Sequence, residues 1–502
     1  MRAHRARPKM SLRASPTLRA VPIGHSCRMR RTDWKPLLDR TAHLATEFLE
    51  SLPDRRVSPV SGAAAMLSAL DRPVPEAPSD PSAVVDELAR TVAPGLTAMP
   101  SGRFFGWVIG GGVPAAVAAD WLTSVWDQNT GSAEGTPAAA AIEHVVLRWV
   151  AQLLELPAAS GALVTGAQMA SFVGLAVARA EVLRAVGWDV EADGLIGAPP
   201  IEVVVGAERH GTIDRALRML GFGTKQVRVV EADREGRLRA HDQRAVAEEL
   251  EPVRAQAGNV NGGGFDPIAT MAARIAEAKQ RRPVWLHLDG AFGLWARVAP
   301  ARRELVAGAE LADSWSTDAH KWLNTPYDCG IALLRDAEAH RRTFHGGATY
   351  LPGEATVPNP FDHTPELSRR ARGFALWAAV RQLGRTGVTE LVERCCAHAT
   401  AFATGLAAID GVEVMNEVVL NQLVVRFRDP EGIDDDAHTR EVTAKVIEDG
   451  VCYPSITTWR GRAGMRISVS NWSTDEDDVR RSIDAIGRAH RGGALTTPPS
   501  AR

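Results

Sequence analysis

One lysine of this 502-residue chain stands where an amine could act as a nucleophile. Lys321 lies within residues 314–324, among aromatic and polar residues and just before an apolar segment. Burial favours the neutral form of a lysine amine, which attacks carbonyl carbons. The alternative is a lysine whose stem packs while its ammonium group reaches solvent. The 58 basic residues favour the first interpretation, because only six are lysines and arginine cannot replace a nucleophilic amine.

Three other candidate groups follow short apolar segments. Asp289 ends the segment 284–288, His210 follows the segment 201–205, and a helix begins at Ala167 and Gln168 after a small-residue turn. In open α/β sheets, ligands bind at the carboxyl ends of the strands. A carboxylate there can pair with a cationic ring or bind a metal, an imidazole can stack or transfer protons, and a helix N-terminus can bind phosphate. Each group alone also fits an ordinary turn or loop.

These groups together with Lys321 match the needs of one cofactor. Pyridoxal phosphate requires an anion site for its phosphate, a stacking partner for its ring, a carboxylate for its ring nitrogen and a lysine for its aldehyde. A Gly/Asn-rich loop at residues 257–266, which contains Asn259, adds a place where the backbone approaches a ligand closely.

The elements that must position these residues alternate between strand and helix. Buried β-rich segments separated by helices predict an α/β fold with a largely parallel sheet. The predicted strands of this part are 201–205, 226–230, 284–288 and 331–334, and its predicted helices include 168–186 and 266–279. Helices at 369–383 and 388–407 with strands at 422–427 and 465–470 predict a smaller C-terminal α+β domain.

The predicted organisation has five parts. They are a disordered basic tail (1–31), an N-terminal helical segment (32–100), a large cofactor-binding domain (101–340), a small C-terminal domain (341–490) and a disordered tail (491–502).

Charge and composition exclude several classes of function. The formal net charge is −2, but residues 1–31 hold nine basic and no acidic residues, so the rest carries −11. An acidic body argues against a nucleic-acid partner. No apolar stretch approaches the ~20 residues that a membrane span needs, and the basic leader lacks the apolar core of a secretory signal. Five cysteines without framework spacing favour the reducing cytoplasm.

The chain resembles the pyridoxal-phosphate-dependent group II amino-acid decarboxylases, the aromatic-amino-acid and glutamate decarboxylase type, and within them a bacterial branch of unassigned substrate. The resemblance runs from about residue 104 to residue 486, and its specific parts are residues 287–291, 313–321, 259–266 and 365–370 with His210. It implies fold type I, with a large, mostly parallel sheet of the seven-stranded type and a small C-terminal α+β domain. It also implies a homodimer with shared active sites, in which the N-terminal segment packs on the partner subunit.

The resemblance also implies roles for single residues. Lys321 would form the Schiff base with pyridoxal 5′-phosphate, and Asp289 would pair with the ring nitrogen. His210 and Ala291 would contact the two faces of the ring, and Asn259 would lie near the ring hydroxyl. The phosphate would be bound by Ala167, Gln168, Ser314 and His320.

Two departures from the family pattern concern the phosphate and the proton donor. Asp318 replaces the usual Asn two residues before the histidine, where a carboxylate would repel a phosphate. In the loop after the lysine, where aromatic decarboxylases carry a protonating tyrosine, the candidates are Tyr350 and His363. That loop also offers Phe361, and in plant relatives phenylalanine at the loop position accompanies oxidative, carbonyl-forming chemistry.

Four residues are candidates for substrate contacts. Trp107, Trp126 and Asn129 lie in the segment that lines the pocket in relatives, which suggests a roomy, partly aromatic site. Arg466, in a predicted strand of the small domain, is either a carboxylate clamp or a structural arginine.

The function that we predict is decarboxylation of an L-amino acid to its amine and CO₂ by a cytoplasmic homodimer without nucleic-acid or membrane partners. One alternative keeps the cofactor but breaks another bond, as in an aldehyde synthase, an aminotransferase or another lyase. A second is a relative that binds the cofactor without catalysis. A third is a metal-dependent hydrolase with the pairs His287/Asp289 and Asp318/His320 as ligands, whereas the main prediction includes no metal.

Overall fold

The computed structural model describes residues 33–239, 253–346 and 357–493. The predicted tail 1–31 and residues 494–502 of the predicted tail 491–502 lie outside the described residues. The chain divides into two compact units. One unit comprises residues 73–90 and the chain up to Leu49, and the other comprises residues 50–72 and the chain from Thr91 onward.

The first unit is built from helices α1 (Trp34–Ser51) and α3 (Pro81–Val92). Arg40 of α1 donates to Asp86 of α3 over 2.7 Å. Neither helix has a buried residue, and both keep large apolar side chains exposed, among them Trp34 and Leu88. The described residues of the chain therefore do not cover these apolar side chains completely.

The second unit contains a seven-stranded sheet with the strand order β1-β7-β6-β5-β4-β2-β3. Five strands run parallel, from β3 to β6, while β7 pairs antiparallel with both β6 and β1. The strands are β1 (Ser160–Val164), β2 (Val203–Gly206), β3 (Val227–Val230), β4 (Val253–Gln256), β5 (Leu286–Asp289), β6 (Ser314–Asp318) and β7 (Gly330–Leu334).

Two apolar cores lie on the two faces of this sheet. Successive side chains of a strand point to opposite faces, so Ile331 and Leu333 of β7 belong to one core and Ala332 and Leu334 to the other. Helices α5 and α10 contribute to the first core, and α6 and α8 to the second. The helices of this part are α2 (Ala63–Leu70), α4 (Pro114–Trp126), α5 (Pro137–Leu153), α6 (Ala167–Ala185), α7 (Val190–Asp193), α8 (Gly211–Met219), α10 (Ile268–Lys279) and α11 (Ala337–Phe344).

Short 3-10 helices connect several of these elements. They are η1 (Ala93–Gly95), η2 (Thr224–Gln226), η3 (Gly293–Val298), η4 (Pro300–Val306), η5 (Ala309–Leu311) and η6 (Pro360–His363). The two apolar cores cover both faces of the seven-stranded sheet, which explains why the sequences of its strands are continuous apolar segments.

A four-stranded sheet with the order β10-β11-β9-β8 forms the C-terminal part. Its strands are β8 (Val412–Val414), β9 (Gln422–Phe427), β10 (Ser455–Trp459) and β11 (Arg462–Ser468), and its helices are α13 (Asp435–Asp449) and α14 (Glu476–His490). The predicted α/β fold, with a mostly parallel large sheet and a small C-terminal α+β part, is confirmed.

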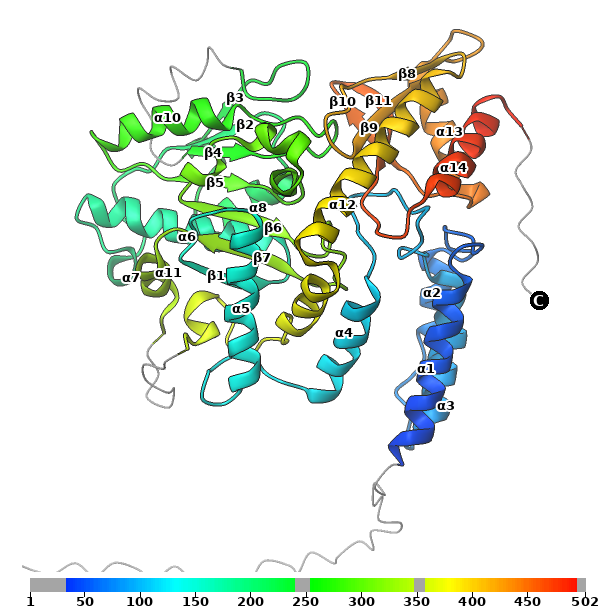
Figure 1. Cartoon of the computed structure of the whole chain (residues 1–502), viewed down its shortest axis with the longest axis horizontal. Helices are drawn as coiled ribbons and strands as arrows, with labels where there is room; N and C mark the ends of the chain where they lie inside the picture. The colour runs from blue at the N-terminus through cyan, green and yellow to red at the C-terminus, as the bar shows by residue number, and fades with distance from the viewer. Residues whose placement is uncertain (1–32, 240–252, 347–356, 494–502) are drawn as a thin grey trace, which may run out of the picture. The chain divides into compact units, whose positions relative to one another are not determined.

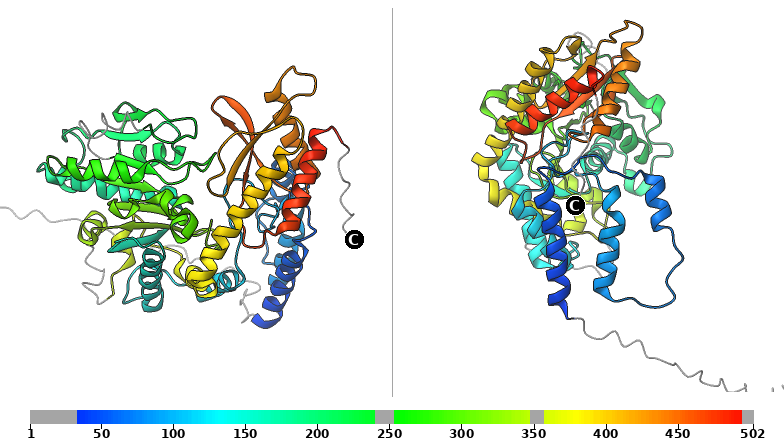
Figure 2. Two further views of the ribbon diagram at one scale, coloured as in Figure 1. Left: turned by 45° about the horizontal axis from the view of Figure 1, so that its top comes forward. Right: turned by 90° about the vertical axis from the view of Figure 1, so that its right-hand side faces the viewer.

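Helix α12 (Gly373–Ala407) links the two sheets. It packs beside α4 and α5 and continues to β8 and β9, as Figures 1 and 2 show. The sequence predicts two helices here, 369–383 and 388–407. The structure confirms two helical segments, which meet at a kink at Gly384, where φ is 60° and ψ is −179°. Glycine adopts this positive φ without steric cost, so the chain changes direction there and then continues the helix.

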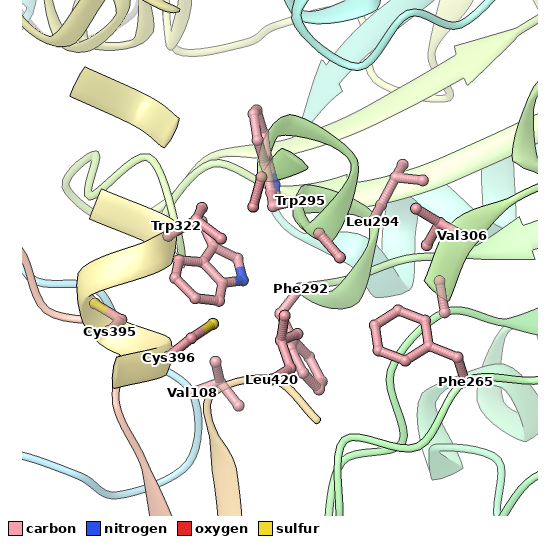
Figure 3. Packing of buried hydrophobic residues seen from close by; sticks show 14 of the residues in the cluster. Val108, Phe265, Phe292, Leu294, Trp295, Val306, Trp322, Cys395, Cys396 and Leu420 are labelled. Carbon is pink, nitrogen blue, oxygen red and sulfur yellow. The ribbon is translucent and has the colours of Figure 1, made fainter. Parts of the chain in front are cut away.

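The apolar core reaches the residue that follows Lys321. Trp322 is fully buried, and Figure 3 shows its indole facing α12 with Cys395, Cys396 and Val108 close to it. This packing anchors one side of the segment that carries the candidate nucleophile.

No helix among the described residues is long and apolar enough to cross a membrane.

Candidate active site

A cavity of about 600 Å³ opens at the carboxyl ends of β5 and β6, beside the N-terminus of α6. Strand β11 of the small sheet contributes to its wall. Nine of the predicted site residues line this single cavity: Trp107, Ala167, Gln168, His210, Asp289, Ala291, His320, Lys321 and Arg466. Residues from separate parts of the chain therefore meet where parallel strands end.

The Lys321 side chain is mostly buried, with 18% of its surface exposed. Its Nζ lies 3.0 Å from Oδ2 of Asp318 and 5.9 Å from the centre of the Phe292 ring. The amine thus has one ionic partner and an aromatic wall, and it opens into the cavity.

The turn after Lys321 is held by Asn324, which is fully buried with a φ of 49°. Its Nδ2 donates to the carbonyl oxygens of Lys321 and Ser470, each over 3.1 Å. On the opposite side, a Cβ at Gly110 would lie 1.8 Å from the Lys321 carbonyl oxygen, so only glycine fits there. The backbone of Lys321 is therefore fixed between the C-terminal part and the segment before α4.

Asp289 is the last residue of β5 and is held by two donors. Its Oδ1 accepts the backbone N–H of Ala291 over 3.1 Å and the hydroxyl of Ser316 over 3.5 Å. Ser316 lies opposite Asp289 in the parallel pairing of β5 and β6, and its hydroxyl is 3.0 Å from that of Ser171. The carboxylate is oriented by its own strand end and by the neighbouring strand.

The N-terminus of α6 is close to the end of β6. The backbone N–H of Ala167 donates to Oδ1 of Asp318 over 2.6 Å. The turn before α6 touches β7, because a Cβ at Gly330 would lie 2.3 Å from the Cα of Gly166. Glycine at both positions permits this close approach and brings the helix N-terminus to the strand ends.

His320 is buried beside Lys321. Its Nδ1 accepts the backbone N–H of Cys329 over 3.2 Å, and its Nε2 lies 3.5 Å from Oδ1 of Asp318. Burial lowers the pKa of His320, which favours the neutral imidazole near neutral pH.

Tyr327 lines the cavity although sequence reasoning did not select it. Its ring stacks on that of His320, with centres 4.2 Å apart and an interplanar angle of 27°. Burial raises the pKa of the Tyr327 phenol, and the negative charge of Asp318 adds to the effect. The sequence feature that could have identified Tyr327 is its position six residues after Lys321, in the same turn.

His210 caps the N-terminus of α8 at the edge of the cavity. Its Nδ1 accepts the backbone N–H of Thr212 over 3.3 Å, so in the neutral ring the proton lies on Nε2. The cap fixes the imidazole through its own helix.

Arg466 of β11 brings a guanidinium into the cavity from the small sheet. It is 8% exposed, and its contact within the described chain is a 3.3 Å hydrogen bond from Nη1 to the carbonyl oxygen of Val260. Its Nε is buried without a hydrogen-bond partner among the described residues, and no described carboxylate forms an ion pair with it. Burial lowers the pKa of Arg466 to about 10, so the group remains cationic at neutral pH.

Two predicted cofactor residues lie outside the lining. Asn259 is fully buried, and its side chain bonds its own loop to the segment after β2: Oδ1 accepts the N–H of Asn261 over 2.8 Å and Nδ2 donates to the carbonyl of Glu208 over 3.1 Å. Ser314 begins β6, and its hydroxyl lies 2.9 Å from Nδ1 of His287. Asn261 lines the cavity in place of Asn259.

The remaining predicted residues lie elsewhere in the described chain. Trp126 packs edge-on against Phe374 at 5.0 Å, and the side chain of Asn129 accepts the backbone N–H of Arg369 over 2.8 Å. His363 contacts the carbonyl of Asn359 over 3.2 Å and lines a separate cavity of about 300 Å³. Burial lowers the pKa of His363. Tyr350 lies outside the described residues.

The described residues offer no ligand cluster that would support the metal-hydrolase alternative. No group of three or more His, Cys, Asp and Glu residues in the described ranges has the arrangement to hold a metal ion. Both ring nitrogens of His287 lie within hydrogen-bond distance of serines, Nδ1 of Ser314 at 2.9 Å and Nε2 of Ser171 at 3.3 Å. The ring of His287 is therefore held by these serines in the interior, beside the sheet.

Comparison with known proteins adds a family. Residues 64–428 match the model of the pyridoxal-dependent decarboxylase conserved domain. The chain is 29% identical over 392 residues to L-2,4-diaminobutyrate decarboxylase of Rhizobium meliloti, with 75% of each chain covered. It is 25% identical over 429 residues to 4-hydroxyphenylacetaldehyde synthase of Rhodiola rosea, with 82% of this chain and 85% of the relative covered.

A solved structure agrees on the fold. The crystal structure of Oryza sativa TDC with PLP and tryptamine superposes with a TM-score of 0.84 at 24% identity, and covers 93% of this chain and 99% of that one. Since the family model spans most of the chain and the architecture is that of fold type I, the chain belongs to the pyridoxal-dependent decarboxylase family and is a carboxy-lyase whose cofactor is pyridoxal 5′-phosphate.

Proposed function

We propose that the protein removes the α-carboxylate of an L-amino acid and releases the amine and CO₂, with Lys321 as the residue that holds the cofactor. The observation that carries this proposal is Arg466. A buried cation without a carboxylate partner in the described chain faces the cavity that also contains Lys321 and Asp289. A buried guanidinium is costly unless an anion pairs with it, and the substrate's carboxylate is such an anion.

The residues present fit the cofactor. The cavity volume of about 600 Å³ lies within the range of small-molecule sites. Lys321 would hold the aldehyde, Asp289 the ring nitrogen and the N-terminus of α6 the phosphate. Pyridoxal 5′-phosphate supplies, when bound, an electron sink for negative charge that develops at the substrate α-carbon.

The chain's own groups divide the remaining tasks. Asp289 would keep a proton on the ring nitrogen through its charge, and the donors Ala291 and Ser316 hold that carboxylate in place. His210 supports one face of the ring from the start of α8. Arg466 orients the substrate by its carboxylate, which selects the bond to be broken.

The lining favours a bulky apolar or aromatic substrate side chain. Trp107, Ile109 and Val260 form an uncharged part of the wall near Arg466. Trp107 is held at a φ of 51°, and its backbone N–H donates to the hydroxyl of Ser455 over 2.9 Å. Arg466 and Lys321 are the lysines and arginines of the described lining, so a second side-chain carboxylate would lack a partner.

A panel of L-amino acids tests the function directly. We expect release of CO₂ and the matching amine in equal amounts, with aromatic substrates preferred over glutamate and aspartate. CO₂, amine, aldehyde and H₂O₂ are measured in the same reaction. A purified, cofactor-loaded protein that turns over none of the panel would contradict decarboxylation and favour a non-catalytic role.

Aldehyde synthesis is the second candidate function. It is favoured by the position of His363, a predicted proton donor, outside the Lys321 cavity, and by the aldehyde synthase among the relatives. Aldehyde with ammonia and H₂O₂ in place of the amine would establish this alternative.

Replacing Arg466 by methionine is expected to lower kcat/KM for the amino acid by about 30-fold or more, because the substrate carboxylate loses a buried ionic partner worth about 2 kcal/mol or more. The product amine lacks that carboxylate, so its inhibition constant should change little. Arg462→Met is the matched control, since Arg462 begins the same strand but pairs with the exposed Glu413. Equal weakening of amino acid and amine would make Arg466 a structural residue.

The active form is proposed to be a homodimer with shared sites. Support within the chain comes from the uncovered apolar side chains of α1 and α3, and from the exposed Trp121 and Val125 of α4. The predicted segment 32–100 would pack on the partner, while 101–340 and 341–490 would form the large and small domains. Sedimentation at assay concentration should give a dimer, and a fully active monomer would refute the shared site.

A cytoplasmic location is the remaining proposal. Cys329, Cys395, Cys396 and Cys452 are buried free thiols in the described chain, which supports a reducing environment. Cell fractionation tests this, and recovery from a secreted fraction would contradict it.

A further inference from the structure

The anion site at the N-terminus of α6 already contains a carboxylate of the same chain. Asp318, the last residue of β6, has only 4% of its side chain exposed. Its Oδ1 accepts the Ala167 backbone N–H over 2.6 Å. This is the N–H that the cofactor's phosphate would need.

The same carboxylate contacts two other cofactor residues. Oδ2 lies 3.0 Å from Nζ of Lys321, and Oδ1 lies 3.5 Å from Nε2 of His320. A single side chain therefore contacts the anion site, the nucleophilic amine and the neighbouring imidazole.

A phosphate bound at the Ala167 N–H would lie beside the Asp318 carboxylate, and the two anions would repel each other. Two like charges about 4 Å apart in a partly buried site interact far more strongly than in water, because the surroundings screen them less. Gly166 has no side chain that could separate the two anions: a Cβ at this position would lie 3.6 Å from Oδ1 of Asp318.

We propose that Asp318 is an internal counter-anion that occupies the phosphate position and pairs Lys321 in the cofactor-free protein. Loading of pyridoxal 5′-phosphate then requires the carboxylate to give up the Ala167 N–H and the Lys321 amine. Asp318 thereby weakens the affinity for the phosphate-bearing cofactor and keeps the cofactor-free state accessible. This inference depends on the cofactor and not on the reaction proposed above.

The test compares cofactors with and without phosphate. Apo protein is prepared by dialysis, and pyridoxal 5′-phosphate or pyridoxal is titrated while tryptophan fluorescence is followed. Asp318→Asn keeps the shape and an oxygen acceptor for Ala167 but removes the charge. We expect the ratio of the Kd for pyridoxal 5′-phosphate to the Kd for pyridoxal to be at least about tenfold lower in Asp318→Asn than in the wild type. Both compounds carry the aldehyde that would bond to Lys321. Any effect of releasing Lys321 from Asp318 therefore changes both Kd values equally and cancels in their ratio.

Glu277→Gln provides the matched control, because it removes one negative charge from the exposed face of α10 and should leave the ratio unchanged. The wild-type protein supplies a measurement that needs no variant: the phosphate should improve binding over pyridoxal by less than about tenfold, and Asp318→Ala should raise that factor as Asp318→Asn does. A ratio in Asp318→Asn that is unchanged or reversed, or a strong phosphate contribution in the wild type, would overturn the proposal.

Discussion

Replacing Lys321 by alanine is expected to abolish the visible absorption that borohydride removes and to lower kcat/KM by at least about 1,000-fold. The reason is chemical, because no other described side chain in the cavity offers an amine: the other nitrogen groups that could be considered are the guanidinium of Arg466 and the imidazoles of His210 and His320. Arginine and histidine cannot replace the amine that bonds to the cofactor's aldehyde. The absorption spectrum of the purified protein and steady-state kinetics check this expectation.

The variant must be distinguished from a folding defect. Lys225→Ala is the matched control, because it removes a lysine of η2 that lies outside the cavity. Its spectrum and kinetics should equal those of the wild type. Circular dichroism of both variants should match the wild type, and Lys225→Ala should also unfold at the wild-type temperature. Lys321→Ala should unfold at a lower temperature, because the buried Asp318 loses its ionic partner. Retention of the visible band in Lys321→Ala would place the covalent attachment on another residue and reject the assignment.

Replacing Asp289 by asparagine is the second change with a large expected effect, a loss of at least about 100-fold in kcat. Asparagine preserves the size of the side chain and an oxygen that accepts the N–H of Ala291, but it removes the charge that, in the proposed mechanism, would keep the ring nitrogen protonated. Because the loss concerns charge that develops during the reaction, KM should change far less than kcat. Kinetics with a saturating cofactor concentration separate the two quantities.

The control for this variant is Asp193→Asn, which makes the same change on the exposed end of α7. Its kcat should be unaffected. Ser316→Ala offers a graded comparison, since Ser316 only orients the carboxylate through a long 3.5 Å contact and should cost less than Asp289→Asn. An Asp289→Asn enzyme that keeps wild-type kcat would show that the ring nitrogen needs no charged partner here.

Local pattern was sufficient to predict the α/β fold and several candidate residues that the structure brings to one cavity, while their roles stay predictions. Four strands of the large sheet follow from apolar β-rich segments, and the strand-end argument selects Asp289 and the turn before Ala167. It succeeds because parallel strands deliver their carboxyl ends to one edge, whatever the details of packing. The lysine shortage selects Lys321 independently, because chemistry allows no substitute for its amine.

Side-chain direction within loops could not be predicted in this way. Asn259 and Asn261 are two residues apart in one loop, yet the side chain of the first is buried in hydrogen bonds to Asn261 and Glu208 and the second lines the cavity. Strand β6 is similar: alternation sends Ser314 and Ser316 into the interior, while Asp318 at its end reaches the helix N-terminus. Which polar group satisfies which donor is decided by neighbours that are distant in sequence.

The long-range pairings came only from the tertiary structure. The sequence alone determined that a candidate nucleophilic lysine, a strand-end carboxylate and a helix N-terminus exist, since each depends on residue type and local periodicity. The fold decided that Arg466 of the small sheet faces the same cavity, and that Asp318 contacts both Ala167 and Lys321. The Asp318–Ala167 contact, and the meeting of Arg466 with Lys321 in one cavity, join segments that lie about 150 residues apart in the chain. Local sequence carries no signal for such distances, because they result from the packing of the two sheets around α12 and from the need to satisfy buried charge.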